Sequence, residues 1–481
     1  MVGLLSGATT AACLRNVGVV GDEQKKPAEI ELPRLGKLKT RPAKEIAASP
    51  LSVGFETLDR SFFDPRKTYA HLAALGAKWA RVQTGWSRTE RVKGYYEFAW
   101  LDEVVDALRG IGMQPWFNLG YGNKLYSPQA PNEAAVGWAP IFDDAAREAW
   151  LAFVRQMAEH FGGRVRHWEI WNEPNITAFW QPRKPDAAGY LELLRATVPE
   201  IRKRMPEAVI IGGAFAGIPK DYIEQCLKLG MGELVDKISY HPYRPLPEQG
   251  YAKEIENLRE LLARHKCRAP LWQGECGCPS QPGGSGALAE LAWDETRQAK
   301  WLLRRILTDL ALEIELTSYF HTVDMVGYFH AGMPKPKTNF KGLLKGSDYT
   351  PKRSYFAYQN LCALFDAETK RSEASTFTIE GRGNAPVQTE GKGFARRGRA
   401  LYAYWQPADL FKEVATPKVR VVVKPENADQ LAQPVLVELL TGAVYRLTPQ
   451  SDGGQLAFDA LPLADSPLIL TDARAIALSG A

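Results

Sequence analysis

Hydrophobic positions follow two alternating patterns over residues 46–368. Short apolar runs, of the length of buried strands, are separated by longer segments in which apolar residues recur every three to four positions, as on the buried face of a helix. The clearest helix is expected at 144–161. Its apolar face carries Trp150, Phe153, Val154, Met157 and Phe161. This alternation predicts parallel strands joined by helices.

Eight strand–helix units are predicted in this region. Strands are expected at 51–56, 78–84, 113–119, 165–171, 208–213, 237–240, 270–274 and 314–320. Helices are expected at 65–75, 100–108, 144–161, 187–205, 222–229, 252–265, 293–312 and 354–365. Such a series predicts an α/β fold with a closed (β/α)8 TIM barrel. A doubly wound sheet would need a glycine-rich phosphate turn after its first strand, and Gly54-Phe-Glu56 does not supply one.

The pattern changes after Phe365, where short alternating segments separated by turn residues begin. Strands are expected at 374–379, 400–405, 419–423, 434–440 and 468–470. They predict a C-terminal antiparallel β-sandwich domain over 369–481, which leaves 46–368 to the barrel. Residues 1–45 are an N-terminal extension. A strand at 29–38 could pair into the sandwich, because the two ends of a domain often lie close together.

Composition and charge narrow the classes of function. Hydrophobic residues make up 45% of the 481 residues, enough for a sizeable core. The net charge of +5 is small against 60 basic and 55 acidic residues, and the basic residues form only short clusters, so no nucleic-acid partner is expected. No apolar run approaches the roughly 18 residues of a membrane-spanning helix. Nothing in the sequence indicates the oligomeric state.

The first residues leave the location open. The apolar start around Cys13 has no basic segment before it, so it is a poor secretory signal. A periplasmic or secreted location would follow if this start were the remnant of a processed signal.

Cofactor signals are missing from the sequence. The six cysteines do not form the paired spacing of a zinc or redox site and are expected to be buried free thiols. The histidines lack the spacing of metal ligands, and neither a phosphate loop nor a serine elbow is present. We therefore expect no cofactor and no metal.

A glutamate closes the tryptophan-rich run at 167–175, which reads His-Trp-Glu-Ile-Trp-Asn-Glu-Pro-Asn. Glu173 falls just past an apolar strand, and Pro174 disfavours an immediate start of the next helix. A general acid needs a carboxyl group in a partly apolar pocket, which keeps it protonated near neutral pH. The adjacent Asn172 is placed to hydrogen-bond a substrate hydroxyl. A tight turn with a capping asparagine would give the same pattern without chemistry.

A second glutamate at the end of a strand, Glu275, follows 102 residues later in Trp272-Gln-Gly-Glu-Cys-Gly277. Two such glutamates in one pocket are what retaining glycoside hydrolysis requires, since one protonates the leaving oxygen and the other attacks the anomeric carbon. We predict Glu173 as the acid/base and Glu275 as the nucleophile. Their carboxyl groups should lie about 5–5.5 Å apart, as retention requires.

Other polar residues at predicted strand ends are candidates for support or substrate binding. Arg81 is expected to keep Glu275 ionised, and Tyr243 is a second donor; a structural ion pair at the barrel mouth is another, compatible reading of Arg81. His241 and Tyr243 stand two apart at the end of a strand and so face one side of the pocket. The remaining candidates for sugar contacts, which could equally be packing residues, are Trp86, Asn118, Tyr121, Asn123, His321 and Asp324.

The two motifs resemble those of the retaining glycoside hydrolases of clan A. Residues 171–174 resemble the clan's acid/base motif at strand 4, and residues 272–277 resemble its nucleophile motif at strand 7. Arg81 and His241-Pro-Tyr243 match positions that support the nucleophile and the first sugar subsite in several of its families. The Trp-Asn-Glu-Pro-Asn form and the appended sandwich are most similar to family 39, whose members include β-xylosidases and α-L-iduronidases. Clan members commonly carry a tryptophan at the end of strand 8, where this chain reads Tyr319-Phe-His321.

The resemblance implies a retaining glycosidase that acts on an oligosaccharide or glycoside through a covalent glycosyl-enzyme. We expect an exo-β-glycosidase. An endo-acting β-glycanase of the same clan is the alternative among enzymes, since an open groove favours endo action and a closed pocket exo action. A barrel that only binds carbohydrate is the alternative outside enzymes. Such a relative would tend to lose one glutamate, whereas this chain keeps both.

Overall fold

The computed structural model describes residues 30–329, 335–381, 387–452 and 455–479. Within these residues, eight parallel strands close into a barrel. The strands are β2 (Leu51–Gly54), β3 (Trp79–Gln83), β4 (Gln114–Leu119), β5 (His167–Ile170), β6 (Val209–Ala216), β7 (Lys237–His241), β8 (Leu271–Cys276) and β9 (Leu316–Tyr319). The barrel closes between β2 and β9, where Ser52 lies opposite Ser318. The predicted (β/α)8 TIM barrel is confirmed.

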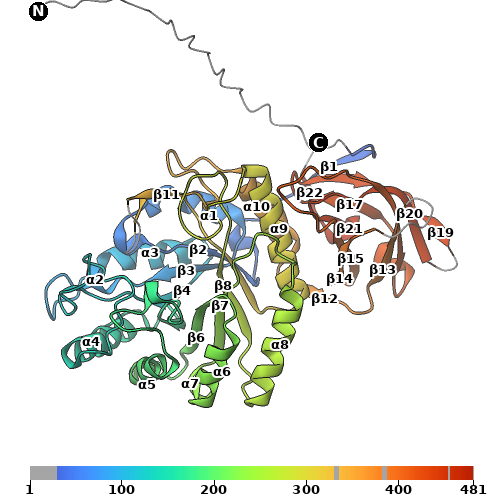
Figure 1. Cartoon of the computed structure of the whole chain (residues 1–481). Coiled ribbons are helices and arrows are strands. Elements are labelled where there is room, and N and C mark those ends of the chain that lie inside the picture. Colours follow the sequence, from blue (N-terminus) through green and yellow to red (C-terminus); the bar gives the residue numbers. More distant parts are fainter. Residues whose placement is uncertain (1–29, 330–334, 382–386, 453–454, 480–481) are drawn as a thin grey trace, which may run out of the picture. The chain divides into compact units, whose positions relative to one another are not determined.

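Helices surround the barrel strands (Figure 1). They are α1 (Tyr69–Leu75), α2 (Trp86–Thr89), α3 (Ala99–Gly110), α4 (Asp144–Phe161), α5 (Ala187–Arg204), α6 (Lys220–Lys228), α7 (Met231–Leu234), α8 (Tyr251–Arg264), α9 (Glu295–Ala311) and α10 (Arg353–Leu364). Three of the long helices begin after an aspartate whose side chain accepts a hydrogen bond from a backbone N–H of the first turn. These aspartates are Asp143, Asp186 and Asp294.

The interior of the barrel is filled with side chains rather than open. Trp116, Ile211, Trp272 and Leu316, which point inward from the early parts of β4, β6, β8 and β9, pack into one buried cluster. The guanidinium carbon of Arg81 lies 5.6 Å from the ring centroid of Trp116. An apolar floor of tryptophan and aliphatic side chains therefore lies beneath the polar residues at the C-terminal ends of the strands.

The segment after β9 contains a two-stranded hairpin, β10 (Met325–Tyr328) and β11 (Lys337–Asn339). The ring of Tyr328 lies 5.3 Å from that of Phe62, in the segment after β2. The sequence did not predict this hairpin, because strands of three or four residues offer too few positions for an alternating pattern.

The C-terminal part consists of two antiparallel sheets, which confirms the predicted fold class. The larger sheet has the order β12 (Thr369–Arg371), β14 (Glu390–Arg396), β15 (Arg399–Trp405), β21 (Leu468–Asp472), β17 (Pro434–Glu438), β18 (Ala443–Arg446), β1 (Arg34–Leu38) and β22 (Leu478–Ser479). The smaller sheet has the order β13 (Thr376–Glu380), β16 (Lys418–Lys424), β20 (Gln455–Pro462) and β19 (Gln450–Asp452). The rings of Phe377 and Tyr402, one from each sheet, lie 5.4 Å apart.

Within the N-terminal extension, β1 pairs antiparallel with β18 and β22 of the larger sheet. Residues 1–29, with Cys13 and the first residue of the strand expected at 29–38, lie outside the described residues. In the described part of the chain, no helix combines the length and the hydropathy needed to cross a membrane. The five cysteines there are buried free thiols, at positions Cys226, Cys267, Cys276, Cys278 and Cys362.

Candidate active site

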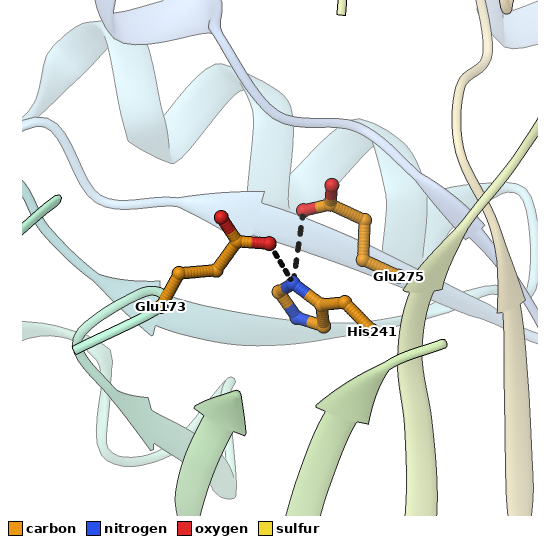
Figure 2. Close-up of side chains that lie close together, drawn as sticks. All are labelled: Glu173, His241 and Glu275. Atoms are coloured by element: carbon orange, nitrogen blue, oxygen red, sulfur yellow. Dashed lines mark hydrogen bonds and ion pairs between the residues drawn. The ribbon is translucent and has the colours of Figure 1, made fainter. Parts of the chain in front are cut away.

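The C-terminal ends of the barrel strands bring Glu173 and Glu275 together. Glu173 lies three residues past β5, and Glu275 lies in β8. Both carboxyl groups approach one ring nitrogen of His241, at the end of β7 (Figure 2). One oxygen of each carboxyl group and that nitrogen lie within 4.8 Å of one another. The closest oxygens of the two carboxyl groups are therefore nearer to each other than the roughly 6.5–9.5 Å that separates the carboxyl groups of inverting glycosidases.

The backbone that carries Glu173 has an unusual conformation. Trp171 and Glu173 have φ angles of +71° and +47°, in the left-handed region that residues other than glycine seldom adopt. The adjacent strand β6 holds this turn. The N–H of Glu173 donates to the oxygen of Ala214 over 2.8 Å, and the Asn175 amide exchanges hydrogen bonds of 3.0 and 2.9 Å with the backbone of Ala216. Such strained backbone occurs mainly where the surrounding structure fixes it, often at functional sites.

Glu173 lies in an environment that favours the protonated carboxyl group. Its side chain is only 12% exposed, and its Oε1 lies 2.9 Å from His241 Nδ1. Burial raises the pKa of Glu173 to about 7, and the positive charge of Arg81 opposes this rise. Burial also lowers the pKa of His241 to about 4, so the neighbouring imidazole is neutral near pH 7. A carboxyl group in this state can donate a proton at neutral pH.

Glu275 has hydrogen-bond donors on both carboxylate oxygens. Its Oε2 accepts from Arg81 Nη1 over 2.7 Å, and its Oε1 accepts from the Tyr243 hydroxyl over 2.8 Å. A guanidinium and a hydroxyl that donate to a carboxylate stabilise the ionised form, which is the form that attacks as a nucleophile. The two glutamates therefore have different surroundings, although they lie side by side.

Arg81 connects the polar groups at the strand ends and is completely buried. Its Nε and Nη2 donate to Glu169 Oε2 over 2.9 and 2.6 Å. Its Nη1 donates to Glu56 Oε1 over 3.1 Å as well as to Glu275. Its Nη2 also donates to Asn172 Oδ1 over 2.8 Å. Arg81 thus both contacts Glu275 and forms a structural ion-pair network, as the sequence allowed. The amide oxygen of Asn172 is directed to this arginine.

Sequence reasoning missed two residues of this network, Glu56 and Glu169. A signal existed for Glu169, which is a charged residue within an apolar strand and is completely buried in the structure. For Glu56, the signal was only its place at the end of the first strand. The missing information was the distance between strands β2, β3 and β5, which a linear pattern does not contain.

Removal of the Arg81 side-chain charge should strongly destabilise the fold. In Arg81→Met, the carboxylates of Glu169 and Glu275 lose their cation, and the carboxyl group of Glu56 loses its hydrogen-bond donor. We expect a loss of about 3–5 kcal/mol in the free energy of unfolding. Guanidinium denaturation followed by circular dichroism measures this loss. The control is Arg202→Met, because the Arg202–Asp236 pair is about 40% exposed and should contribute below about 1 kcal/mol. Equal losses in both variants would contradict a buried network.

Two predicted binding residues lie beneath the site rather than in it. The Trp86 ring stacks on Tyr126 at 5.4 Å, its indole N–H donates to Glu90 over 2.6 Å, and it is 1% exposed. Asn118 is completely buried and donates to Glu169 Oε2 over 2.9 Å. Sugar contacts of Trp86 and Asn118 stay predictions, and the buried positions of the two side chains do not support them. Trp86 belongs to the core, where its ring also contacts Trp150 and Phe153 of α4.

His321 also lies behind the site. Its ring is completely buried, with Nδ1 3.0 Å from the oxygen of Val323 and Nε2 3.2 Å from the backbone oxygen of Glu56. Burial lowers the pKa of His321 to about 4, so the ring is neutral. The structure places His321 next to Glu56 instead of next to the catalytic candidates.

The ligand atoms of Glu173, His241 and Glu275 would also be close enough to bind one metal ion. However, Arg81 and Tyr243 already donate to the two oxygens of Glu275. A guanidinium at 2.7 Å from Glu275 Oε2 would repel a cation bound to the same oxygen. These contacts disfavour a metal ion bound to Glu275.

The sequence profile of glycosyl hydrolases family 39 matches residues 78–271 of this chain. The matched segment runs from β3 to the start of β8, so it includes Glu173 and His241 and ends just before Glu275.

Individual relatives agree with the family match. The chain is 25% identical over 162 residues to a β-xylosidase of Geobacillus stearothermophilus, and the aligned region covers 32% of this chain and 31% of the relative. It is also 28% identical over 190 residues to a β-xylosidase of Caldicellulosiruptor saccharolyticus, and this aligned region covers 36% of this chain and 35% of the relative. These matches span about a third of the relatives' length. A family 39 glycoside hydrolase from Bacteroides cellulosilyticus has the same fold, with a TM-score of 0.63 and 21% identity over 90% of this chain and 81% of that one.

Proposed function

We propose that this clan A glycoside hydrolase, which is most similar to family 39, is a retaining β-glycosidase. The observation that carries the proposal is the pair of unlike carboxyl groups. Glu173 is largely buried, with a pKa raised to about 7, whereas Glu275 receives hydrogen bonds from Arg81 and Tyr243. Two neighbouring carboxyl groups whose surroundings favour opposite protonation states suit an acid and a nucleophile.

The reaction would proceed in two displacements. In the first, Glu275 attacks the anomeric carbon and forms a glycosyl ester, while Glu173 gives its proton to the departing oxygen. In the second, the ionised Glu173 takes a proton from water, the water oxygen bonds to the anomeric carbon, and the ester bond to Glu275 breaks. His241 contacts Glu173 and holds its carboxyl group in place for both steps.

We further propose exo action on a β-xyloside or a closely related glycoside. Two relatives bear the name β-xylosidase, which makes a β-xyloside the first substrate to test. The hairpin residue Tyr328 supports a partly closed site. Burial raises the pKa of its phenol, Arg60 opposes this, and the nearby charges of Glu275 and Glu173 add to the rise. The hairpin that carries Tyr328 follows β9, whose C-terminal end faces the site, and a wall on that side would favour exo action.

Hydrolysis of nitrophenyl β-glycosides, with the xyloside first, tests the proposal. Proton NMR during turnover should show the β-anomer as the first product, because two displacements retain configuration. Release of single sugars from the end of a β-linked oligosaccharide would support exo action, and release of internal fragments would indicate the endo-acting alternative. Binding without turnover of any glycoside would favour the carbohydrate-binding alternative, and a first product of inverted configuration would contradict retention.

The pH dependence should report the proton on Glu173. The raised pKa means that Glu173 keeps its proton up to about pH 7 and loses it above. For alkyl glycosides, which need a proton on the leaving oxygen, kcat/KM should therefore fall about tenfold per pH unit above that point. A dinitrophenyl glycoside, whose leaving group needs no proton, is the control and should show a much smaller fall. Equal alkaline falls for both substrates would contradict the role of Glu173.

A further inference from the structure

Glu56 is an unused titratable group directly behind the nucleophile. Its side chain is completely buried, and its Oε1 accepts from the same Nη1 atom of Arg81 that binds Glu275. Within the described residues, Glu56 Oε2 is buried without a hydrogen-bond partner. The neighbouring Gly54 leaves room for this oxygen, since a Cβ at that position would lie 2.4 Å from it. One oxygen of the Glu56 carboxyl group is thus hydrogen-bonded, and the other is buried without a hydrogen-bond partner.

The charges around Arg81 do not balance if every carboxyl group is ionised. One guanidinium faces three carboxyl groups, those of the buried Glu56 and Glu169 and that of Glu275, whose side chain is 15% exposed. A buried carboxylate without a cation or several donors is costly, and such a group takes up a proton instead. Glu169 accepts two hydrogen bonds from Arg81 and one from Asn118, whereas Glu56 accepts one from Arg81. Among the three, Glu56 accepts the fewest hydrogen bonds from side chains.

We propose that Glu56 carries a proton in the free protein and acts as a positioning residue, which holds Arg81 by one oxygen and leaves the charge of that arginine to Glu169 and Glu275. The inference rests on the proposed function, because it assigns Glu275 as the nucleophile. An ionised Glu56 would compete with Glu275 for the positive charge of Arg81. A neutral Glu56 still accepts a hydrogen bond from Nη1 and so fixes where the guanidinium lies.

The charged and titratable neighbours of Glu56 agree with this state. They come from three strands: Arg81 from β3, Glu275 from β8, and His321, which follows β9 and lies 3.4 Å from Glu56 Oε2 through its Nε2. Burial raises the pKa of Glu56 to about 8, the charge of Arg81 opposes the rise, and Glu275 adds to it. His321 is neutral, so it offers Glu56 no positive charge.

A matched pair of variants tests the positioning role. Glu56→Gln has the shape of the protonated acid and keeps an oxygen for Arg81, so kcat/KM at pH 6 should stay within about threefold of the wild type. Glu56→Ala removes the hydrogen bond that supports Arg81. Its kcat/KM at pH 6 should fall about 100-fold, because small displacements of catalytic groups have effects of this size. Glu315→Gln, which changes a half-exposed carboxylate at the opposite end of the barrel, is the control. A Gln variant as impaired as the Ala variant would show that the ionised carboxylate is needed and would overturn the proposal, as would two unimpaired variants.

Infrared difference spectroscopy tests the proton directly. The spectrum of the wild type minus that of Glu56→Gln at pH 6 should contain the C=O band of an un-ionised carboxylic acid, and the band should vanish as the pH rises past about 8. Absence of the band at pH 6 would overturn the inference. Because the spectrum needs no substrate, a protein without glycosidase activity would refute the proposed function while this measurement still decides the state of Glu56.

Discussion

Replacement of Glu275 with alanine should abolish the turnover of every glycoside, whatever its leaving group. The carboxylate of Glu275 forms the covalent bond to the sugar in the proposed mechanism, and no neighbouring group can replace it. Tyr243 and Arg81 contact its two oxygens, but as hydrogen-bond donors. We expect kcat to fall by roughly 10⁵-fold, on the scale seen when the nucleophile of a hydrolase is removed. Initial rates on a series of aryl glycosides measure the fall.

Azide should then act in place of the missing nucleophile. The space that the Glu275 carboxyl group leaves faces the side of the sugar opposite to the leaving group, so azide should yield the α-glycosyl azide from a β-glycoside. The control is Glu315→Ala, which removes a carboxylate at the other end of the barrel and should keep near-normal activity. Near-normal activity of Glu275→Ala itself would refute its assignment.

The barrel could be predicted because its elements have strong periodic patterns. The helix expected at 144–161 is α4, with the same bounds, since its buried apolar positions recur from Ala146 to Phe161 and an aspartate caps its start. The strand expected at 165–171 is shorter, because Trp171 has a left-handed backbone at its end. The strand expected at 208–213 is longer, since β6 continues past an irregular register between Gly212 and Phe215. A bulge of this kind leaves no periodic signal.

The sandwich was predicted less completely. Strand β15 was expected at 400–405, where Leu-Tyr-Ala-Tyr-Trp has a high β-propensity. Its partner β14, with the sequence Glu-Gly-Lys-Gly-Phe-Ala-Arg, was not expected. Glycine and charged residues are depleted in strands, so pairing with β15 and not local propensity forms this element.

The candidate site was predictable where a residue's place along a strand is enough. Glu173, His241 and Glu275 each follow or end a strand, and the C-terminal ends of barrel strands meet at one face, so the structure brings them together. The network of Arg81 was only half predicted, since its links to Glu56 and Glu169 depend on side-chain direction across the barrel. The catalytic roles stay proposals, which the two glutamate variants test.

Replacement of Glu173 with alanine should impair the enzyme according to the leaving group. The first step needs a proton from Glu173 only when the departing oxygen is basic, so alkyl glycosides should lose about 10²–10⁴-fold in kcat/KM. Glycosides of acidic phenols should lose much less in this step, because a stable phenolate leaves without a proton. A plot of log kcat/KM against the acidity of the leaving phenol should therefore be steeper for Glu173→Ala than for the wild type.

Azide should also act in the second step of the Glu173 variant, but its product should have the opposite configuration to the product of Glu275→Ala. Without Glu173, water has no general base, and the glycosyl ester on Glu275 should accumulate. Azide needs no base and attacks the ester from the face that the leaving group vacated, so it should restore turnover and yield the β-glycosyl azide. Each variant thus serves as the control for the other, since both remove one glutamate from the same site and differ in the face that they open. Proton NMR of the two azides decides the assignment: exchanged configurations would mean that Glu173 is the nucleophile and Glu275 the acid.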